Sequence, residues 1–314
     1  MVLNYSDCIV FIAIFDSSVS AHVKGHLISE GFPEQRVLTL SKFDNFSNLV
    51  FSRIELPVTQ RCSLRCRDCA NLMQYYQNPK DTPYLQVIRD IDLMMKFIDY
   101  VIQLHILGGE PFIVNSDLPK YIAHLAVNYK HKFSEIRITT NGTILPTCDV
   151  LEQISAHKEH VRVYISDYGE LSNNIGGLIG KLSHFNIPYI VWKHDWTHMH
   201  KLVDGEQNDY DYAIRVYQNC ARFCTNMYNG KLYHCTFLAH AEELGAIPYA
   251  KENSVDLNDP HTTKSDVKKY RSNENIPPGC AFCGGDGRSG ERFPSAVQVE
   301  ASLKYKKYIK TLEE

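Results

Sequence analysis

The segment Cys62-Ser-Leu-Arg-Cys66-Arg-Asp-Cys69 carries three cysteines within eight residues and directly follows an apolar, strand-like run. One loop of this kind can wrap an iron–sulfur cubane and ligate three of its irons. Iron–sulfur clusters normally take four cysteine ligands, so the missing fourth cysteine leaves one iron open to a ligand from outside the protein. An open position is typical of a catalytic rather than a structural metal site. The alternative is a zinc site completed by a distant histidine.

Strand-like and helix-like patterns alternate around this loop, from about residue 49 to residue 212. The pattern predicts strands at Phe51–Val58, Val101–Leu107, Glu135–Thr139, Val161–Ser166 and Tyr189–Trp192. It predicts helices at Tyr84–Tyr100, Leu118–Tyr129, Val150–His157 and Leu171–Phe185. Repeated βα units favour a parallel sheet covered by helices, either open or curled into a full or partial barrel.

Short polar or glycine-rich motifs follow three of the predicted strands, at the ends where such folds gather their chemistry. These motifs are Gly108-Gly109-Glu110-Pro111, Thr140-Asn141-Gly142 and Ser166-Asp167. Two glycines let a backbone approach closely, and Glu110 can accept charge-assisted hydrogen bonds. Each motif is also open to a plainer interpretation as a turn or a helix cap. Together with the cysteine loop, they predict one site at the strand ends.

Five more cysteines lie in the last third of the chain, where the periodicity weakens from about Ala213 onward. They are Cys220, Cys224, Cys235, Cys280 and Cys283. We therefore expect residues 213–314 to form a small domain organised by metal rather than by a large apolar core, with Gly230 in a hairpin turn. A structural zinc site with four cysteine ligands is one possibility. Cys8 and Cys148 stand apart from both groups and are predicted to be small core residues.

The N-terminal residues 1–48 predict one βαβ unit, an appended subdomain with strands at Ile9–Phe15 and Arg36–Leu40 around a helix at Ala21–Glu30. No Gly-x-Gly-x-x-Gly turn follows its first strand, so dinucleotide binding is not expected. The net charge of −3, from 33 basic and 36 acidic residues, gives no reason to expect a nucleic-acid partner. No run is long enough to span a membrane and no signal peptide is apparent. We expect a cytoplasmic protein, in which disulfides are disfavoured.

The C-x3-C-x2-C loop, followed one strand later by Gly108-Gly109-Glu110-Pro111, resembles the radical S-adenosylmethionine superfamily. The resemblance implies a partial (β/α)6-type barrel over residues 49–212 and a [4Fe–4S] cluster on Cys62, Cys66 and Cys69. It implies S-adenosylmethionine on the open iron and an electron donor such as flavodoxin or ferredoxin. The glycine-rich turn is expected to contact the methionine ammonium through Glu110. Thr140, Asn141 and Ser166 are expected near the ribose or carboxylate. Asp68 departs from the family, which usually has an aromatic residue there.

The C-terminal cysteines resemble the SPASM and twitch extensions of the same superfamily, and their small number favours the shorter twitch type with one auxiliary [4Fe–4S] cluster. The implied ligands are Cys220, Cys235, Cys280 and Cys283. Cys224 is then surplus, either an alternative ligand in place of Cys220 or a thiol that returns a hydrogen atom to a substrate radical. His234 and His240 are expected to lie outside the ligand set.

The substrate is predicted only as a class. A loose resemblance to radical enzymes of bacterial surface-polysaccharide pathways favours a small polar molecule, such as a sugar or nucleotide sugar, that undergoes epimerisation, dehydrogenation or rearrangement. One alternative is a peptide-modifying maturase. Another is a non-catalytic iron–sulfur electron-transfer or scaffold protein, which has no need of the glycine-rich turn.

Overall fold

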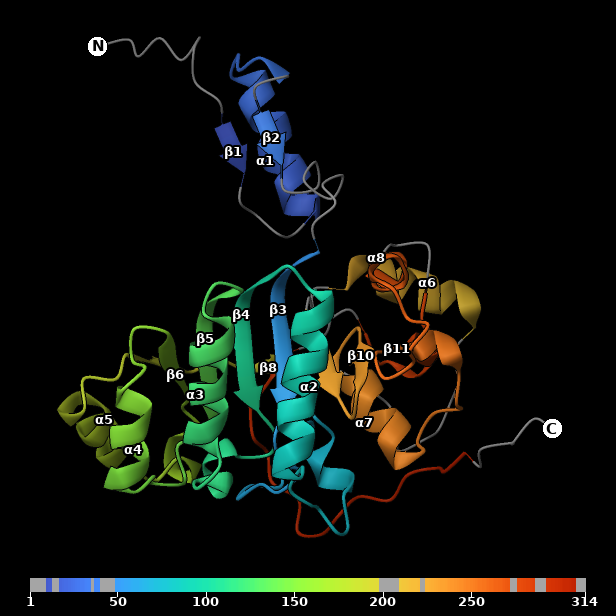
Figure 1. Ribbon diagram of the computed structural model, residues 1–314. Helices are drawn as coiled ribbons and strands as arrows, with labels where there is room; N and C mark the ends of the chain where they lie inside the picture. The colour runs from blue at the N-terminus through green and yellow to red at the C-terminus, as the bar shows by residue number, and fades with distance from the viewer. Residues whose placement is uncertain are drawn as a thin grey trace, which may run out of the picture.

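An eight-stranded, mostly parallel sheet forms the centre of the molecule (Figure 1). The computed structural model describes residues 10–12, 17–34, 37–39, 49–197, 209–220, 224–271, 276–285 and 292–308. The sheet order is β11-β10-β9-β3-β4-β5-β6-β7. Its strands are β3 Val50–Pro57, β4 Tyr100–Leu107, β5 Phe133–Thr140, β6 Val161–Ser166, β7 Tyr189–Trp192, β9 Thr225–Tyr228, β10 Lys231–Tyr233 and β11 Ser254–Asp256. The outermost strands β11 and β7 do not pair with each other, so the sheet is open, as in a partial barrel.

Four helices cover one face of the five parallel strands β3–β7, and in Figure 1 they lie in front of and beside them. They are α2 Tyr84–Phe97, α3 Leu118–Tyr129, α4 Cys148–Ser155 and α5 Ile175–His184. Successive strand residues point to opposite faces, and the alternate residues Ile54 and Leu56 of β3 are buried in the core beneath these helices. Arg53 and Glu55 point to the other face. The sequence pattern thus predicted the βα layout of residues 49–197, while the helix expected to reach Tyr100 ends at Phe97 because Tyr100 already begins β4.

The N-terminal unit has its own two-stranded sheet. β1 Val10–Ile12 pairs in parallel with β2 Val37–Thr39, and α1 Ser17–Ser29 connects them. The predicted βαβ unit is confirmed over the residues described. Cys8 lies outside the described residues, whereas Cys148 is exposed at the start of α4, so its prediction as a core residue is wrong. None of the helices in the described ranges has both the length and the apolar character that crossing a bilayer requires.

The C-terminal segment extends the central sheet instead of folding apart from it. β9 pairs in parallel with β3, and the β9–β10 turn carries Asn229 and Gly230 at positive φ of 51° and 78°. This is the hairpin predicted at Gly230, with the turn geometry that matches strand twist. The remaining elements are α6 Tyr210–Asn219, α7 Thr236–Leu244, α8 Lys264–Arg271, the 3-10 turns η6 Lys251–Asn253 and η7 Pro278–Phe282, and the strand pair β8 Trp196–Thr197 with β12 Arg292–Phe293.

A second buried apolar cluster lies in this segment, with Phe237, Leu238 and Phe282 among its members. The expectation that this segment lacks an apolar core of its own was therefore wrong. Its organisation by metal stays a prediction. The predicted boundary between residues 212 and 213 falls inside α6. A division into separate domains stays a prediction.

Asp90 ties α2 to the β9–β10 hairpin. Its Oδ1 accepts a hydrogen bond from the Gly230 amide at 2.8 Å and another from Gln86 Nε2 at 2.7 Å. The side chain is buried, and burial raises the pKa of Asp90 to about 6, although the hydrogen bonds from Gln86 and Gly230 oppose the rise. The carboxylate thus joins the N-terminal and C-terminal halves of the sheet layer at an electrostatic cost.

Asp90→Asn isolates that cost, because Asn keeps an Oδ1 acceptor but carries no charge. Burial raises the pKa of Asp90 in the folded state above its ordinary value of 3.8. The contribution of Asp90 to the free energy of unfolding is therefore fully present below about pH 4, where the carboxyl is protonated in both states. It is lost as the pH rises through about 6. Over this pH range the free energy of unfolding of the wild type should fall by roughly 2–3 kcal/mol relative to that of the Asn variant. Urea unfolding of both metal-free proteins at pH 4 and pH 7 measures the difference. An equal gap at the two pH values would contradict the expectation.

Candidate active site

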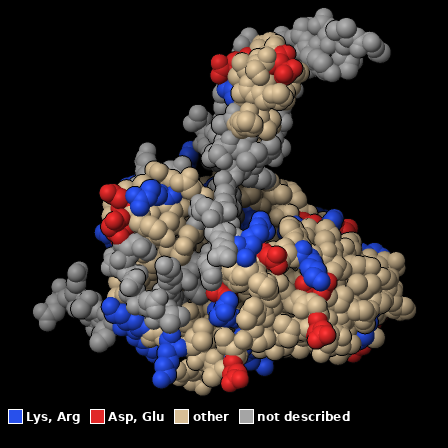
Figure 2. Space-filling model, turned by 180° about the vertical axis from the view of Figure 1, so that it is seen from behind, with Lys and Arg blue, Asp and Glu red and all other residues tan. Residues whose placement is uncertain are grey.

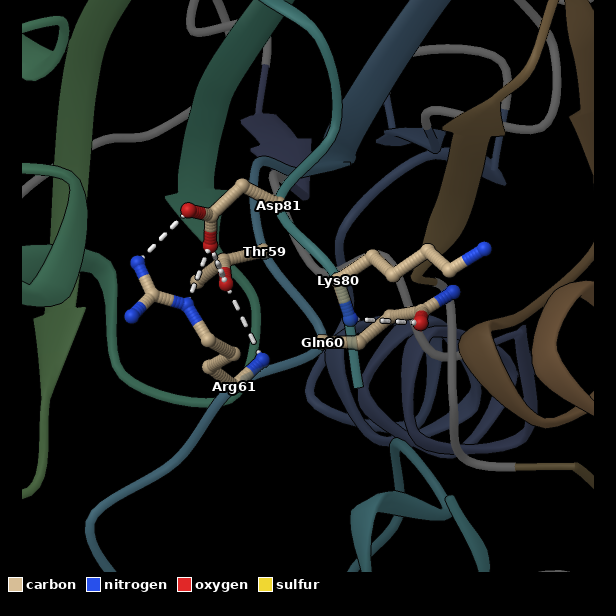
Figure 3. A network of polar contacts seen from close by, with 5 residues as sticks. All are labelled: Thr59, Gln60, Arg61, Lys80 and Asp81. Carbon is tan, nitrogen blue, oxygen red and sulfur yellow. Dashed lines mark hydrogen bonds and ion pairs between the residues drawn. The ribbon is translucent and has the colours of Figure 1, made fainter. Parts of the chain in front are cut away.

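A polar network holds the start of the cysteine loop against the segment before α2 (Figure 3). Arg61 donates to both oxygens of Asp81, from Nε at 2.8 Å and from Nη2 at 2.6 Å. Thr59 Oγ1 donates to Asp81 at 2.6 Å and accepts from the Arg61 amide at 3.0 Å. Lys80 N donates to Gln60 Oε1 at 3.1 Å. The chain that leaves β3 is therefore fixed in place before it reaches Cys62.

Gly108 and Gly109 pack directly on the backbone of this loop. The Gly109 amide donates to Thr59 O at 2.8 Å, and the Glu110 amide donates to Arg61 O at 2.9 Å. A Cβ on Gly108 would lie 2.4 Å from Thr59 O, and one on Gly109 would lie 2.1 Å from Arg61 O. The two glycines are thus required for contact between two loops of the protein itself. The expected approach of this turn to a bound ligand stays a prediction.

Glu110 is fully buried, and its carboxylate is occupied by the protein. It accepts from Thr140 Oγ1 at 2.8 Å, from the Asn141 amide at 2.8 Å and from the Phe112 amide at 3.1 Å. Burial raises the pKa of Glu110 to about 7, and these donors oppose the rise. The carboxylate joins the loop after β4 to the loop after β5. These partners match the plainer interpretation of Glu110 as a cap of the turn; its expected contact with the methionine ammonium stays a prediction.

Asn141 extends this connection to the cysteine loop. Its Nδ2 donates to Cys62 Sγ at 3.5 Å and to Ser63 Oγ at 3.1 Å. Ser166, at the end of β6, accepts through its carbonyl from Ser172 Oγ at 3.1 Å, and the same hydroxyl lies 2.7 Å from Asn141 O. The strand-end motifs of β3, β4, β5 and β6 are therefore joined to one another by hydrogen bonds. The sequence prediction of a single site at these ends agrees with this arrangement.

The thiols of Cys62, Cys66 and Cys69 lie close enough to influence one another. Burial raises the pKa of Cys62 above its usual range, and neighbouring Cys69, Glu110 and Cys66 raise it further. Burial also raises the pKa of Cys66 to about 12, with Cys69 adding to the rise. Three thiolates cannot share such a pocket unless a cationic centre accompanies them, because burial and mutual repulsion both disfavour the charged form. The donor set therefore fits a thiolate-ligated iron–sulfur cluster.

Tyr168 is a neighbour of this group that sequence reasoning missed. Burial raises the pKa of Tyr168, its side-chain hydrogen bond with Ser166 opposes the rise, and Cys66, Cys69 and Cys62 add to it. Its ring meets Trp196 of β8 edge-on, with the centroids 5.6 Å apart. The sequence did offer one indication of this residue, because Tyr168 lies two residues beyond Ser166, just past the end of a strand.

Residues 297–299 pair with the cysteine loop through an isolated antiparallel bridge between Gln298 and Cys66, which sequence reasoning also missed. Gln298 Nε2 donates to Cys66 Sγ at 3.3 Å, and Gln298 Oε1 accepts from the Arg65 amide at 2.8 Å. The Arg67 amide donates to Val297 O at 2.7 Å, and the Val299 amide donates to Arg65 O at 2.9 Å. A segment distant in sequence therefore supplies a direct hydrogen-bond donor to one of the three sulfurs.

The second cysteine group also converges. Burial raises the pKa of the Cys235 thiol well above its usual value, and Cys224, Cys280 and Cys220 add to the rise. Burial likewise raises the pKa of Cys280, with further contributions from Cys283 and Cys220. Cys235 precedes α7, while Cys280 and Cys283 lie at η7. All five cysteines thus belong to one neighbourhood at the edge of the sheet.

The histidines near this group have other partners. His234 lies between Tyr217 and Tyr270, with ring centroids 5.0 and 4.1 Å away, and His240 Nδ1 is 2.9 Å from the Tyr76 hydroxyl. Within the described ranges, no three His, Cys, Asp or Glu side chains are arranged around a position for a single metal ion.

A row of polar side chains crosses the sheet face opposite the helices. Asn226 of β9, Glu55 of β3, His105 of β4, Arg137 of β5 and Arg162 of β6 are register partners in successive strands; we call them the polar row. The view from behind shows basic and acidic side chains intermingled on that side of the molecule (Figure 2). The apolar face of these strands is explained by its packing against the helices. That packing does not explain why the opposite face carries the polar row.

The surroundings of Cys224 connect the second cysteine group with this face. Cys224 is buried immediately before β9. Burial lowers the pKa of Arg53, but Glu55 and then Cys224 more than offset this effect, so the pKa is raised overall. Arg53 lies on the same face as the polar row, two residues before Glu55. Cys224 is thus near both the other C-terminal cysteines and the polar face.

Comparisons with known proteins give only distant likenesses. No protein-family model matches the chain, and no curated protein matches it. Among solved structures, BtrN in complex with AdoMet and 2-DOIA aligns at 12% identity over 79% of this chain and 98% of its own, with a TM-score of 0.47. The enzyme anSMEcpe with bound AdoMet and Cp18Cys peptide aligns at 15% identity over 45% of this chain and 42% of its own, with a TM-score of 0.36.

Streptococcus suis SuiB bound to S-adenosylmethionine aligns at 14% identity over 58% of this chain and 48% of its own, with a TM-score of 0.30. This chain therefore spans less than half the length of anSMEcpe and of SuiB in these alignments. At such identities and TM-scores we draw no functional conclusion from the likeness. The residues of the site itself carry the proposal below.

Gly109→Ala tests whether the two loops must touch. The new Cβ would lie 2.1 Å from Arg61 O, and backbone on both sides leaves no flexible side chain to move away. We expect a loss of at least about 2 kcal/mol in unfolding free energy, measured by thermal or urea unfolding. Gly176→Ala in α5 is the matched control, because a Cβ there meets nothing within 4 Å. Equal stability of the two variants would show that the loop contact is not required.

Proposed function

We propose that this chain is a radical S-adenosylmethionine enzyme whose catalytic [4Fe–4S] cluster is held by Cys62, Cys66 and Cys69. The observation that carries the proposal is the interlocking of the three-cysteine loop with the Gly108-Gly109-Glu110-Pro111 turn through two backbone hydrogen bonds. The sequence pattern required both elements at strand ends, and the fold brings them into direct contact. An electron-transfer protein has no chemical need for this second loop.

Several residues of the chain would each have a separate role at this site. When bound, the cluster supplies the electron that cleaves S-adenosylmethionine to methionine and a 5′-deoxyadenosyl radical, which abstracts hydrogen from the substrate. Asn141 and Gln298 orient sulfurs of Cys62 and Cys66 through their amide donors. Because the Glu110 carboxylate already accepts from three protein groups, we assign contact with the methionine ammonium to the backbone of the glycine-rich turn.

Thr140, Asn141 and Ser166 stay our candidates for polar contacts to the ribose or carboxylate of S-adenosylmethionine. Their positions at adjoining strand ends support this role. The Thr140 hydroxyl donates to Glu110, so its contribution to a ligand would come from its remaining acceptor capacity. The reaction also needs an external one-electron donor, such as flavodoxin or ferredoxin, and a reducing compartment like the cytoplasm keeps the cysteines available.

We further propose a twitch-like auxiliary [4Fe–4S] cluster on Cys220, Cys235, Cys280 and Cys283. Its support is the mutual proximity of these thiols and the influence of both Cys220 and Cys283 on Cys280. Cys224 is the additional cysteine of the group. Its proximity to Arg53 supports a position facing the substrate, where its thiol could return a hydrogen atom, with a ligand role in place of Cys220 as the alternative.

The polar row supports a small polar substrate, with epimerisation, dehydrogenation or another rearrangement at carbon as the reaction. It lies on the same sheet as the cysteine loop, on the face opposite the helices. A peptide substrate has no comparable feature in its favour among the described residues. A sugar or nucleotide sugar fits the hydrogen-bonding groups of this face.

The simultaneous change of Cys62, Cys66 and Cys69 to Ala tests the catalytic assignment. The anaerobically reconstituted wild type should hold about eight iron per chain, as expected for two cysteine-ligated cubanes, and should form 5′-deoxyadenosine with dithionite and S-adenosylmethionine. The triple variant should hold about four iron and form none. Iron analysis and chromatographic product analysis provide the two measurements.

Two outcomes would contradict parts of this scheme. Formation of 5′-deoxyadenosine by the triple variant at the wild-type rate would refute the catalytic assignment. About four iron with one tightly held zinc in the wild type would refute only the auxiliary cluster, because the loop of Cys62 would still bind its own cubane.

Gln298→Met tests the hydrogen bond to Cys66 independently of turnover. Donors to cluster sulfurs stabilise the more negative reduced state, so loss of the amide should lower the midpoint potential of the catalytic cluster, on the order of tens of millivolts. An EPR-monitored redox titration measures it. Glu300→Gln is the matched control, because Glu300 meets Arg65 through its backbone oxygen. Equal potentials in wild type and Gln298→Met would remove the tuning role.

A further inference from the structure

The polar row contains buried groups that have no hydrogen-bond partner among the described residues. Asn226 is 0% exposed, and neither its Oδ1 nor its Nδ2 has a partner in that part of the chain. His105 is 3% exposed, and the same holds for its Nε2. A buried polar group without a partner destabilises the folded state, and such groups in native proteins require an explanation. A ligand that supplies the missing partners is an explanation common to both residues.

The guanidiniums around His105 add positive charge. Arg53 donates to Glu55 through Nε and Nη2 at 3.1 and 3.0 Å, and Arg137 donates to Glu135 through the same two atoms at 3.3 Å each. Arg162 contacts Glu135 at 3.0 Å. Three guanidiniums thus share two carboxylates, which leaves one positive charge without an acidic counterpart among these side chains.

The environment keeps His105 neutral and places two cations around it. Burial first, and then the nearby Arg53 and Arg137, lower the pKa of His105 to about 2. Burial lowers the pKa of Arg137, while Tyr164 and Glu135 oppose that effect and Arg53 adds to it. The Arg53 guanidinium is partly exposed and that of Arg137 largely buried. Two such cations that disfavour each other gain from an anion placed between them. Arginine is also the side chain whose planar donors best match a carboxylate or phosphate.

We propose that the face formed by Arg53, His105, Arg137 and Asn226 binds a hydroxylated small molecule through an oxyanion, either a phosphate or a carboxylate. This inference rests on the proposed function and specifies its substrate class. Arg53, Arg137, the His105 Nε2 and the Asn226 Nδ2 serve as donors to the oxyanion and its neighbours. The Asn226 Oδ1 is an acceptor, so it requires a donor from the ligand, which a sugar hydroxyl provides and a bare anion does not.

Three probes separate the features of such a ligand: glucose 1-phosphate, glucuronate and glucose. Calorimetric titration of the reconstituted full chain should detect saturable binding of glucose 1-phosphate, of glucuronate or of both, at an affinity at least tenfold above that for glucose. Preference for glucose 1-phosphate identifies a phosphate, and preference for glucuronate identifies a carboxylate. Absence of saturable binding for both charged probes, or equal binding of glucose, would overturn the proposal.

Substitutions locate the binding on the molecule. Arg53→Met and Arg137→Lys should each weaken binding of the charged probe at least tenfold, because each removes a guanidinium fork. Arg89→Met removes one charge from the exposed side of α2 and should leave the affinity unchanged. Asn226→Asp keeps the size of the side chain but replaces a donor by a negative charge, so it should abolish binding. Circular dichroism confirms that each variant is folded.

Unchanged affinity in Arg53→Met and Arg137→Lys would overturn the assignment even if the wild type binds a probe. The two proposals fail separately in this design. A wild type that forms 5′-deoxyadenosine but binds neither charged probe contradicts only the oxyanion site. A wild type that binds a charged probe through these arginines but never cleaves S-adenosylmethionine contradicts only the radical chemistry.

Discussion

Direct contact between two backbones, with no side chain between them, is the constraint on which the site depends. The turn after β4 lies on the loop after β3 so closely that the peptide groups of Gly109 and Glu110 bond to Thr59 and Arg61. Any side chain at Gly108 or Gly109 would overlap a carbonyl oxygen. The position of Cys62 relative to the next strand end is therefore set by backbone geometry, which varies much less than side-chain packing does.

Glu110 connects this pair of loops to the loop that follows β5. Its buried carboxylate accepts from Thr140 and from the Asn141 amide, and Asn141 in turn reaches the cysteine loop. A carboxylate in such a place is expensive to bury, so its retention makes sense only where geometry matters more than stability. Hydrogen bonds thus connect the three strand ends, and residues that follow three different strands fix the position of the cysteine loop.

Local patterns allowed much of this structure to be predicted, and long-range contacts account for what was missed. The βα layout, the N-terminal unit and the hairpin at Gly230 follow from periodicity and turn chemistry over short windows. The role of Gln298 depends on a partner 232 residues earlier in the chain, and no local pattern contains that information. The polar row was present as alternate polar residues such as Arg53 and Glu55, but its meaning required the strand register. Cys148 was misjudged because composition alone does not reveal which side of a helix start faces solvent.

The pairing of residues 297–299 with the cysteine loop also sets an order of events during synthesis. The ribosome adds about 5–20 residues per second, so the cysteine loop waits on the order of ten seconds or more before Gln298 exists to bond with it. Until then Cys66 lacks both its amide donor and the backbone pairing that covers its loop. For the cluster proposed above, this order means that a nascent chain would present an accessible loop to whatever delivers iron and sulfide, before residues 297–299 arrive to cover it. The position of one glutamine in the sequence would then place loading of the cluster before completion of the fold.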